Sequence, residues 1–264
     1  MIEWFITTLG NSPDNFILAA GAVLLALLAL IVAALSRRLL FAKGCGQDDQ
    51  HTKLAEIVHG SLLAFTVFVL ALVLNDVRGN LARADDATLR EASTMMRLDL
   101  ELKMAKVPGA AAAREALRTY ANAVVAYDWP ALSTYKPSLS AQSETALFDL
   151  IEAVDRVALV APRSSPALKT QLDKLQDLRQ GRLESATKSV ARVLWWTIGA
   201  FLLGAMIMNG RHPIDRASVG LITLHIGSIG LVIALILVMD EPFRGQTSIP
   251  PDPIAKAFEN SGTP

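Results

Sequence analysis

The chain has 264 residues, of which 52% are hydrophobic, and its 25 basic and 25 acidic residues give a formal net charge of zero. A neutral chain lacks the basic face that nucleic-acid binding needs. The single cysteine, Cys45, excludes an intrachain disulfide and a cysteine-rich metal site. The apolar residues are gathered into runs, which is typical of a membrane protein.

Four apolar blocks are arranged two and two around a long polar middle. A bilayer core takes about 20 apolar residues per helix, and fewer when the flanking residues snorkel. We therefore expect an all-α membrane protein with four transmembrane helices and a helical extramembrane stalk domain between the second and the third. The blocks cover residues 16–35, 60–74, 194–208 and 219–239.

These blocks divide the chain into four predicted segments. They are an N-terminal segment with the first two spans (1–75), the stalk (76–193), the last two spans (194–246) and a flexible tail (247–264). No Lys or Arg precedes Arg37, and Arg37 and Arg38 follow the first block. This order indicates a retained anchor rather than a cleaved signal.

Two short segments have predictions of their own. Trp4 and Phe5 favour an N-terminal stretch that lies at the membrane interface. Residues 43–49 are rich in turn formers and predict a linker between the first two spans.

One long helix is predicted between His51 and Lys106, because the stretch has no proline and only two glycines. It would cross the membrane, continue into solvent and end at the Val-Pro-Gly of residues 107–109. The residues expected on its inward face in the stalk are Leu81, Thr88, Ala92, Met95, Leu98 and Leu102.

Three further helices complete the predicted stalk. One covers residues 110–128, and another covers 140–161 with Ser140 as its N-cap. The last opens at Ser165-Pro166 and is expected to run straight into the third span. Its leucines at helical spacing are Leu168, Leu172, Leu175, Leu178 and Leu183.

Polar residues in or beside the spans have both structural and functional interpretations. His225 lies deep in the fourth block, where a histidine bonded to a neighbouring helix is the plainer alternative to a proton relay or ligand. Gly227 and Gly230 beside it indicate close helix contact. Glu56 and His59 have the spacing of a metal-ligand pair, but no second copy of that pair occurs. No nucleotide, catalytic or cofactor motif is present, so we expect neither an enzyme nor a bound cofactor or metal.

The string from Asp240 to Gly245, directly after the fourth block, is the most specific in the chain. Its acidic pair, proline and glycine form a helix stop. In a symmetric oligomer the same residues would form a ring of charge at a pore mouth.

The topology and a number of short residue strings give the chain a resemblance to a known family. The second span begins with Gly60 and reads Ala64-Phe65-Thr66, and it leads to Arg78 and Arg83. The other residues that carry the resemblance are Glu91, Ala92, Tyr120, Trp129, Asp240, Pro242, Phe243 and Gly245. Over residues 19–249 the chain resembles the bacterial DUF4239 family, whose members are called bestrophin-like.

The resemblance implies a homo-oligomeric channel for small ions, most of all anions, in the bacterial inner membrane, with a pentamer favoured. In such a channel the second span lines the pore and narrows to a hydrophobic neck, which gates by dewetting. Two sets of residues on this span lie on one helical face and could form the neck. One is Leu62, Phe65, Val69 and Leu72, and the other is Leu62, Thr66, Val69 and Val73.

Two other functions and two orientations stay open. The chain could be a non-conducting sensor or scaffold that acts through the stalk, or, with Glu56, His59 and His225, a membrane enzyme or metal transporter. Basic residues in the two short loops place those loops in the cytoplasm and the stalk outside. The resemblance implies the opposite, with the helical domain in the cytosol.

Overall fold

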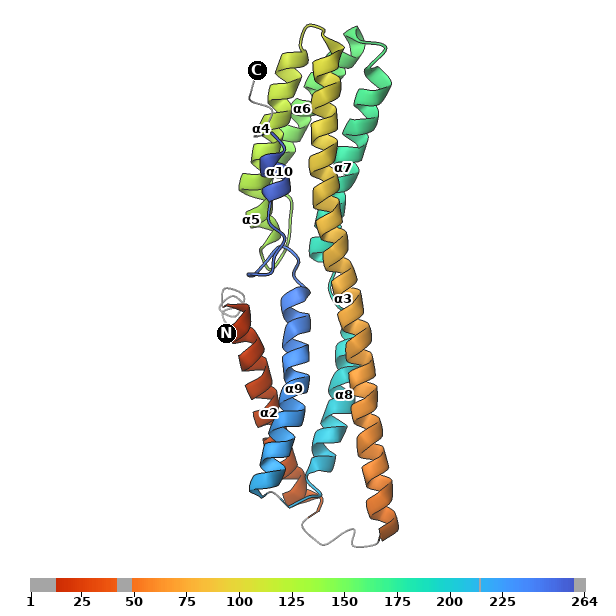
Figure 1. Ribbon diagram of the computed structural model, residues 1–264, viewed down its shortest axis with the longest axis vertical. Coiled ribbons are helices and arrows are strands. Elements are labelled where there is room, and N and C mark those ends of the chain that lie inside the picture. The colour runs from red at the N-terminus through yellow and green to blue at the C-terminus, as the bar shows by residue number, and fades with distance from the viewer. Residues whose placement is uncertain (1–12, 42–48, 214, 259–264) are drawn as a thin grey trace. The chain divides into compact units, whose positions relative to one another are not determined.

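The computed structural model describes residues 13–41, 49–213 and 215–258. Within these ranges the chain forms helices and no strand, which confirms the all-α fold class (Figure 1). The predictions for Trp4, Phe5 and the linker at 43–48 lie outside the described residues. The chain divides into two compact units. We call Met1–Gly79 with Ser189–Asp240 the membrane unit, and Asn80–Lys188 with Glu241–Pro264 the stalk unit.

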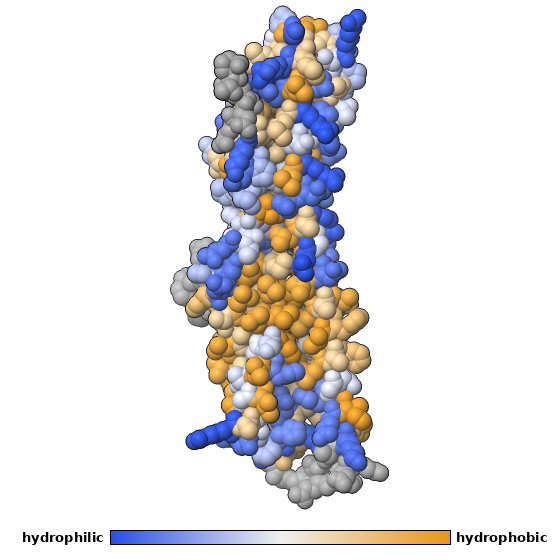
Figure 2. Space-filling view, viewed as in Figure 1, coloured by the Kyte–Doolittle hydropathy of each residue, from blue (hydrophilic) through white to orange (hydrophobic). Residues whose placement is uncertain are grey.

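The membrane unit is built from four helices that are long and apolar enough to cross a bilayer. They are α2 (Asp14–Leu39), the first part of α3 (Asp49–Ala105), α8 (Arg192–Asn209) and α9 (Arg216–Met239). Apolar side chains gather on the surface of this unit (Figure 2), as a lipid-facing surface requires. The protein is therefore a multi-pass membrane protein.

Helices α2 and α9 approach closely where both carry small residues. A Cβ atom built on Gly230 would lie 2.7 Å from the Gly21 carbonyl oxygen and 2.9 Å from the Leu25 Cβ. On the other helix, a Cβ on Gly21 would lie 2.6 Å from the Ala234 Cβ. Small residues let membrane helices pack backbone to backbone, where dispersion forces replace the hydrophobic effect. The expected close contact at Gly230 is present.

The predicted long helix is continuous as α3, which spans Asp49–Ala105 and belongs to both units. Its inward face in the stalk is confirmed, since Thr88, Ala92, Met95, Leu98 and Leu102 are buried and Leu81 is partly buried. The helix ends at the predicted place. Lys106 and Gly109 there both have positive φ angles, 49° and 87°, so the chain turns sharply before the next helix.

Between α3 and α8 the stalk unit has five further helical segments, which pack with the second part of α3. These are α4 (Ala110–Ala123), the π-helical turn η1 (Val124–Asp128), α5 (Trp129–Leu132), α6 (Ala141–Val160) and α7 (Ser165–Thr187). Ser140 caps α6 as predicted, because its Oγ accepts a hydrogen bond from the Ser143 N–H at 3.1 Å. The N-cap of α7 is Ser164, one residue earlier than predicted.

The expected continuous helix from the stalk into the third span is wrong. Helix α7 ends at Thr187, and α8 begins at Arg192. Lys188 has an extended backbone with ψ of 123°. In the break the Val190 side chain is buried in the core of the membrane unit, and its N–H donates to Asp240 Oδ2 at 3.4 Å. These two contacts stabilise the non-helical backbone of residues 188–191.

The flexible tail predicted from residue 247 is also wrong for the part that is described. Ile249, Ile254 and Ala257 are buried in the stalk core, and the short helix α10 covers Asp252–Lys256. The Ile249 N–H donates to the Pro242 carbonyl at 2.9 Å, which closes a loop. Three buried apolar residues therefore fix a segment whose prolines suggested an extended chain.

The close contact of α2 with α9 gives a matched pair of substitutions. Gly230→Ala should destabilise the chain by about 1–3 kcal/mol, because the new methyl group meets a backbone oxygen and a Cβ below 3 Å. Gly227→Ala is the control, since its Cβ would lie 3.6 Å from the nearest atom, the Ala22 oxygen. Both changes raise helix propensity equally. Thermal unfolding of the detergent-purified chain should show a clearly lower midpoint for Gly230→Ala alone; equal midpoints would contradict this packing.

Candidate functional site

A buried ion pair lies at the centre of the stalk unit. Glu91 on α3 and Arg182 on α7 both have fully buried side chains, and Arg182 Nε lies 2.5 Å from Glu91 Oε2. Arg182 Nη2 also donates to Glu91 Oε1 at 3.2 Å. The guanidinium thus contacts both carboxylate oxygens. Two residues that are 91 positions apart in the chain are joined without any access to solvent.

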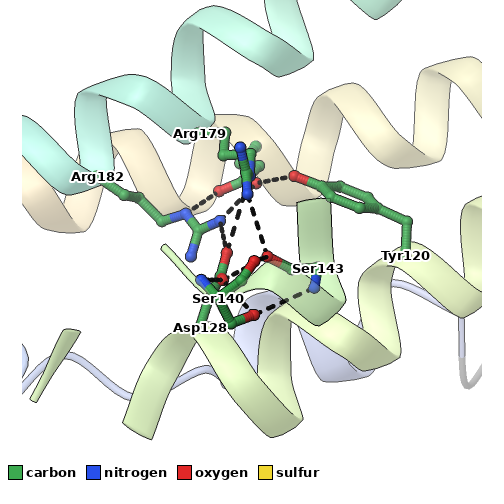
Figure 3. A network of polar contacts seen from close by, with 7 residues as sticks. Tyr120, Asp128, Ser140, Ser143, Arg179 and Arg182 are labelled. Carbon is green, nitrogen blue, oxygen red and sulfur yellow. Dashed lines mark hydrogen bonds and ion pairs between the residues drawn. The ribbon is translucent and has the colours of Figure 1, made fainter. Parts of the chain in front are cut away.

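Asp128 is the second buried acid at this cluster (Figure 3). Its Oδ2 accepts a bond from Arg182 Nη2 at 3.2 Å. Its Oδ1 accepts the Ser140 N–H at 2.9 Å, the Ser140 hydroxyl at 3.0 Å and the Ser143 hydroxyl at 2.5 Å. Arg179 Nε lies 3.9 Å from Asp128 Oδ2. Each oxygen of the carboxylate therefore has a partner, and the start of α6 is tied to the π-helical turn.

Two aromatic residues complete the surroundings of the ion pair. The Tyr120 hydroxyl on α4 donates to Glu91 Oε1 at 3.4 Å. The Arg182 guanidinium lies over the Trp129 ring, 5.2 Å from its centre, a distance at which a desolvated cation is attracted to an aromatic face. Trp129 Nε1 donates to the Ile249 carbonyl at 2.9 Å, and the Phe243 ring meets Trp129 edge-on with centroids 5.6 Å apart.

The charges in this cluster balance. Glu91 and Asp128 are opposed by Arg182 and Arg179, so two acids face two bases. Burial raises the pKa of Glu91, and the neighbouring Arg182 opposes that rise. Burial would by itself lower the pKa of Arg182, but Glu91, Tyr120 and Asp128 raise it above its ordinary value. Burial also raises the pKa of Tyr120 well above its ordinary value, so the phenol stays protonated as the donor to Glu91.

The cluster therefore ties α7 to α3 and to the π-helical turn. Breaking a buried ion pair leaves an uncompensated charge in a low dielectric, which is far costlier than losing an exposed pair. A second tie joins α3 to α4, where Arg114 donates twice to Asp99, at 2.7 and 2.9 Å. Hydrogen bonding to Asp99 raises the pKa of Arg114.

The structure brings together four residues that carried the resemblance. Glu91 and Trp129 contact Arg182 directly, Tyr120 donates to Glu91, and Phe243 packs against Trp129. These contacts give the scattered positions one physical role, which is to build the surroundings of the buried ion pair.

The other residues of the string from Asp240 to Gly245 lie at the end of α9 and in the turn that follows it. Pro242 is buried, and Gly245 has a positive φ of 85°, as the predicted turn requires. Asp240 accepts a hydrogen bond from the Val190 N–H, and the exposed Glu241 pairs with Arg244 at 3.2 Å. The string thus ends α9 and leads the chain into the stalk core, as its structural interpretation predicts.

The neck candidates lie on α3 in the membrane unit and differ in exposure. Phe65 and Leu72 are exposed, at 55% and 53%, whereas Thr66 is fully buried and its hydroxyl donates to the Leu62 carbonyl at 2.8 Å. Leu62 and Val69 are partly buried. The Phe65 ring lies 5.7 Å from Phe201 of α8. Arg78 and Arg83, farther along α3, are exposed.

Sequence reasoning missed Asp128, Arg179 and Arg182 as members of a site. A signal for the two arginines existed in the spacing of α7. Its buried leucines Leu168, Leu172 and Leu175 repeat at intervals of four and three residues, and Arg179 and Arg182 continue that repeat. An arginine at a core position predicts a buried acid opposite. Nothing comparable marked Asp128, whose role depends on the tertiary fold.

Comparison with known proteins places the whole arrangement in a family. The family model of the Bestrophin-like domain matches residues 23–254, which include most of the first span, the other three spans and the stalk. The chain belongs to the bestrophin-like family. No curated protein and no solved structure matches it. The match confirms the resemblance seen in the sequence, and the ion cluster of this bestrophin-like chain lies inside the matched region.

Removing one member of the buried Glu91–Arg182 pair should destabilise the chain much more than removing both. Arg182→Met should lower the free energy of unfolding by about 3–5 kcal/mol, because Glu91 is left buried and unpaired. The double substitution Glu91→Met with Arg182→Met should lower the free energy of unfolding by less than Arg182→Met alone, because no unpaired Glu91 is left and the Asp128–Arg179 pair remains. Urea unfolding of the full chain in detergent, followed by far-UV circular dichroism, measures both.

The control for this cycle is Arg156→Met, which removes an exposed pair with Glu152 on α6. It should change the free energy of unfolding by less than about 1 kcal/mol. If Arg182→Met were no more harmful than this surface change, the buried pair would not be the tie described above.

Proposed function

We propose that copies of this chain assemble in the bacterial inner membrane into a channel that conducts small anions. Family membership supports a membrane channel, and the four spans supply the transmembrane part. The observation that carries the proposal is the unbroken helix α3, which runs from the second span into the stalk unit. One helix per copy would then line both a pore and the vestibule beyond it. By resemblance, five copies surround the axis.

The exposed face of α3 supports one of the two possible necks. Phe65 and Leu72 are free to face an axis, with Leu62 and Val69 beside them at helical spacing. Thr66 and Val73 are buried against the chain's own helices, so the set that contains them is less suited. A ring of Phe65 and Leu72 side chains would make an apolar constriction that expels water until it widens.

The charges near the ends of the spans favour anions. The exposed Glu241 carboxylate pairs with Arg244 at 3.2 Å, which partly offsets its charge. Arg78 and Arg83 are exposed on α3 just beyond the span. In an assembly they would form rings of positive charge beside the exposed carboxylates of Asp85 and Asp86, the second of which pairs with Arg90. Rings of arginine attract anions toward a pore.

Anion flux into liposomes that contain the purified chain tests this function. We expect flux well above that of empty vesicles, and a mass in detergent of several copies. A single-copy mass, or flux equal to that of empty vesicles together with a closed axis in particle images, would contradict the proposal.

The neck itself is tested by trimming its side chains. Phe65→Ala and Val69→Ala should each raise the conductance several-fold, because a wider apolar constriction holds water more readily. Ile31→Ala is the control, since Ile31 is an exposed apolar residue on α2, a helix that is not part of the proposed pore wall. Single-channel currents in planar bilayers measure the effect. Unchanged currents in Phe65→Ala and Val69→Ala would remove these residues from the pore.

A second candidate function is that of a non-conducting sensor or scaffold, and one observation favours it. The stalk half of α3 carries exposed apolar side chains at helical spacing, where water-facing residues should be polar. They are Leu89, Met96, Leu100 and Met104. Such a stripe suits a protein partner. The flux measurement separates this function from the channel.

A further inference from the structure

A groove of about 540 Å³ lies between α3 and α9 in the membrane unit. Its wall on α3 includes Val67, Leu70 and Leu74, and its wall on α9 includes Leu224, His225 and Ser228. Most of this surface is apolar, as a surface within a membrane should be. His225 and Ser228 are the exceptions, and they lie three residues apart on one face of α9.

His225 lies at a depth in the membrane where a polar side chain needs a hydrogen-bond partner. It is exposed on the single chain, nine residues after Arg216 at the start of α9, or about 14 Å along the helix axis. That depth is near the middle of a hydrocarbon core of about 30 Å. Ser228 satisfies its own hydroxyl by donating to the Leu224 carbonyl at 2.7 Å. Within the described residues the His225 imidazole makes no such hydrogen bond.

The groove also lies on a different side of α3 from the proposed neck. Val67 and Leu74 each follow a neck residue, Phe65 or Leu72, by two positions, which is about 200° around the helix. If Phe65 and Leu72 face the axis, the groove faces away from it. Pore water is therefore not what satisfies His225.

Two occupants remain, a lipid tail or a protein helix, and His225 decides between them. An acyl chain offers no hydrogen-bonding group, and ionisable side chains within membrane segments almost always face protein or a water-filled cavity. We propose that a second copy of this chain packs into the groove and covers Leu224, His225 and Ser228. The inference rests on the proposed assembly and adds the surface through which neighbouring copies meet.

Photocrosslinking in intact membranes tests this surface. p-Benzoylphenylalanine in place of Leu221, which lines the groove and is 68% exposed, would react with whatever lies next to it. Two differently tagged copies are expressed together, so an adduct with both tags identifies self-association. The matched control has the same probe in place of Thr223, which is exposed at nearly the same depth but about 200° around α9.

We expect several-fold more mixed-tag adduct from position 221 than from position 223. Lipid adducts alone at position 221, with light scattering showing an oligomer in detergent, would overturn the groove as the interface and leave the proposed assembly standing. A single-copy mass with no mixed-tag adduct at either position would instead overturn the assembly. Rapid labelling of Leu221→Cys by a water-soluble thiol reagent, in a Cys45→Ser background, would show that the groove faces water and would also overturn the inference.

Discussion

The guanidinium of Arg182, held without solvent between Glu91 and Asp128, is the contact on which the stalk unit depends. It joins α7 to α3 and to the π-helical turn, and through Tyr120 and Ser143 it involves α4 and α6 as well. Leucine and alanine contacts fill the core around it, but they would tolerate small shifts. A neutral cluster of two acids and two bases does not tolerate such shifts, because a displaced side chain leaves an unpaired charge in a low dielectric.

Helix α3 connects this cluster to the proposed channel. The helix supplies the second span in the membrane unit and the Glu91 carboxylate in the stalk unit. The two halves of the helix differ in what they bury. Near Phe65 and Phe68 the helix exposes apolar side chains, whereas around Glu91 it buries the face that packs on the other stalk helices. The residues that fix the stalk half thus belong to, or pack on, the same continuous helix that the proposed pore requires.

Much of the fold could be predicted from local pattern, and the failures have identifiable causes. Apolar runs located the spans, and the absence of proline predicted α3 correctly to its end near Lys106. The break between α7 and α8 carries no such signal, since residues 188–191 hold neither glycine nor proline and are held by tertiary contacts of Val190. Glu91, Tyr120, Trp129 and Phe243 were found through family resemblance. Arg182 was missed because an arginine in a charged helix is usually exposed, although its spacing from the buried leucines of α7 marked a core position.

Amide hydrogen exchange of the full chain in detergent tests most directly whether the buried cluster holds the stalk unit together. In the unsubstituted chain, the amides around Glu91, Asp128 and Arg182 should exchange among the slowest in the stalk, at a common rate set by one cooperative opening. In Arg182→Met, exchange should accelerate in α3, α4, α6 and α7 together. Acceleration confined to α7, with the other three helices unchanged, would contradict the account.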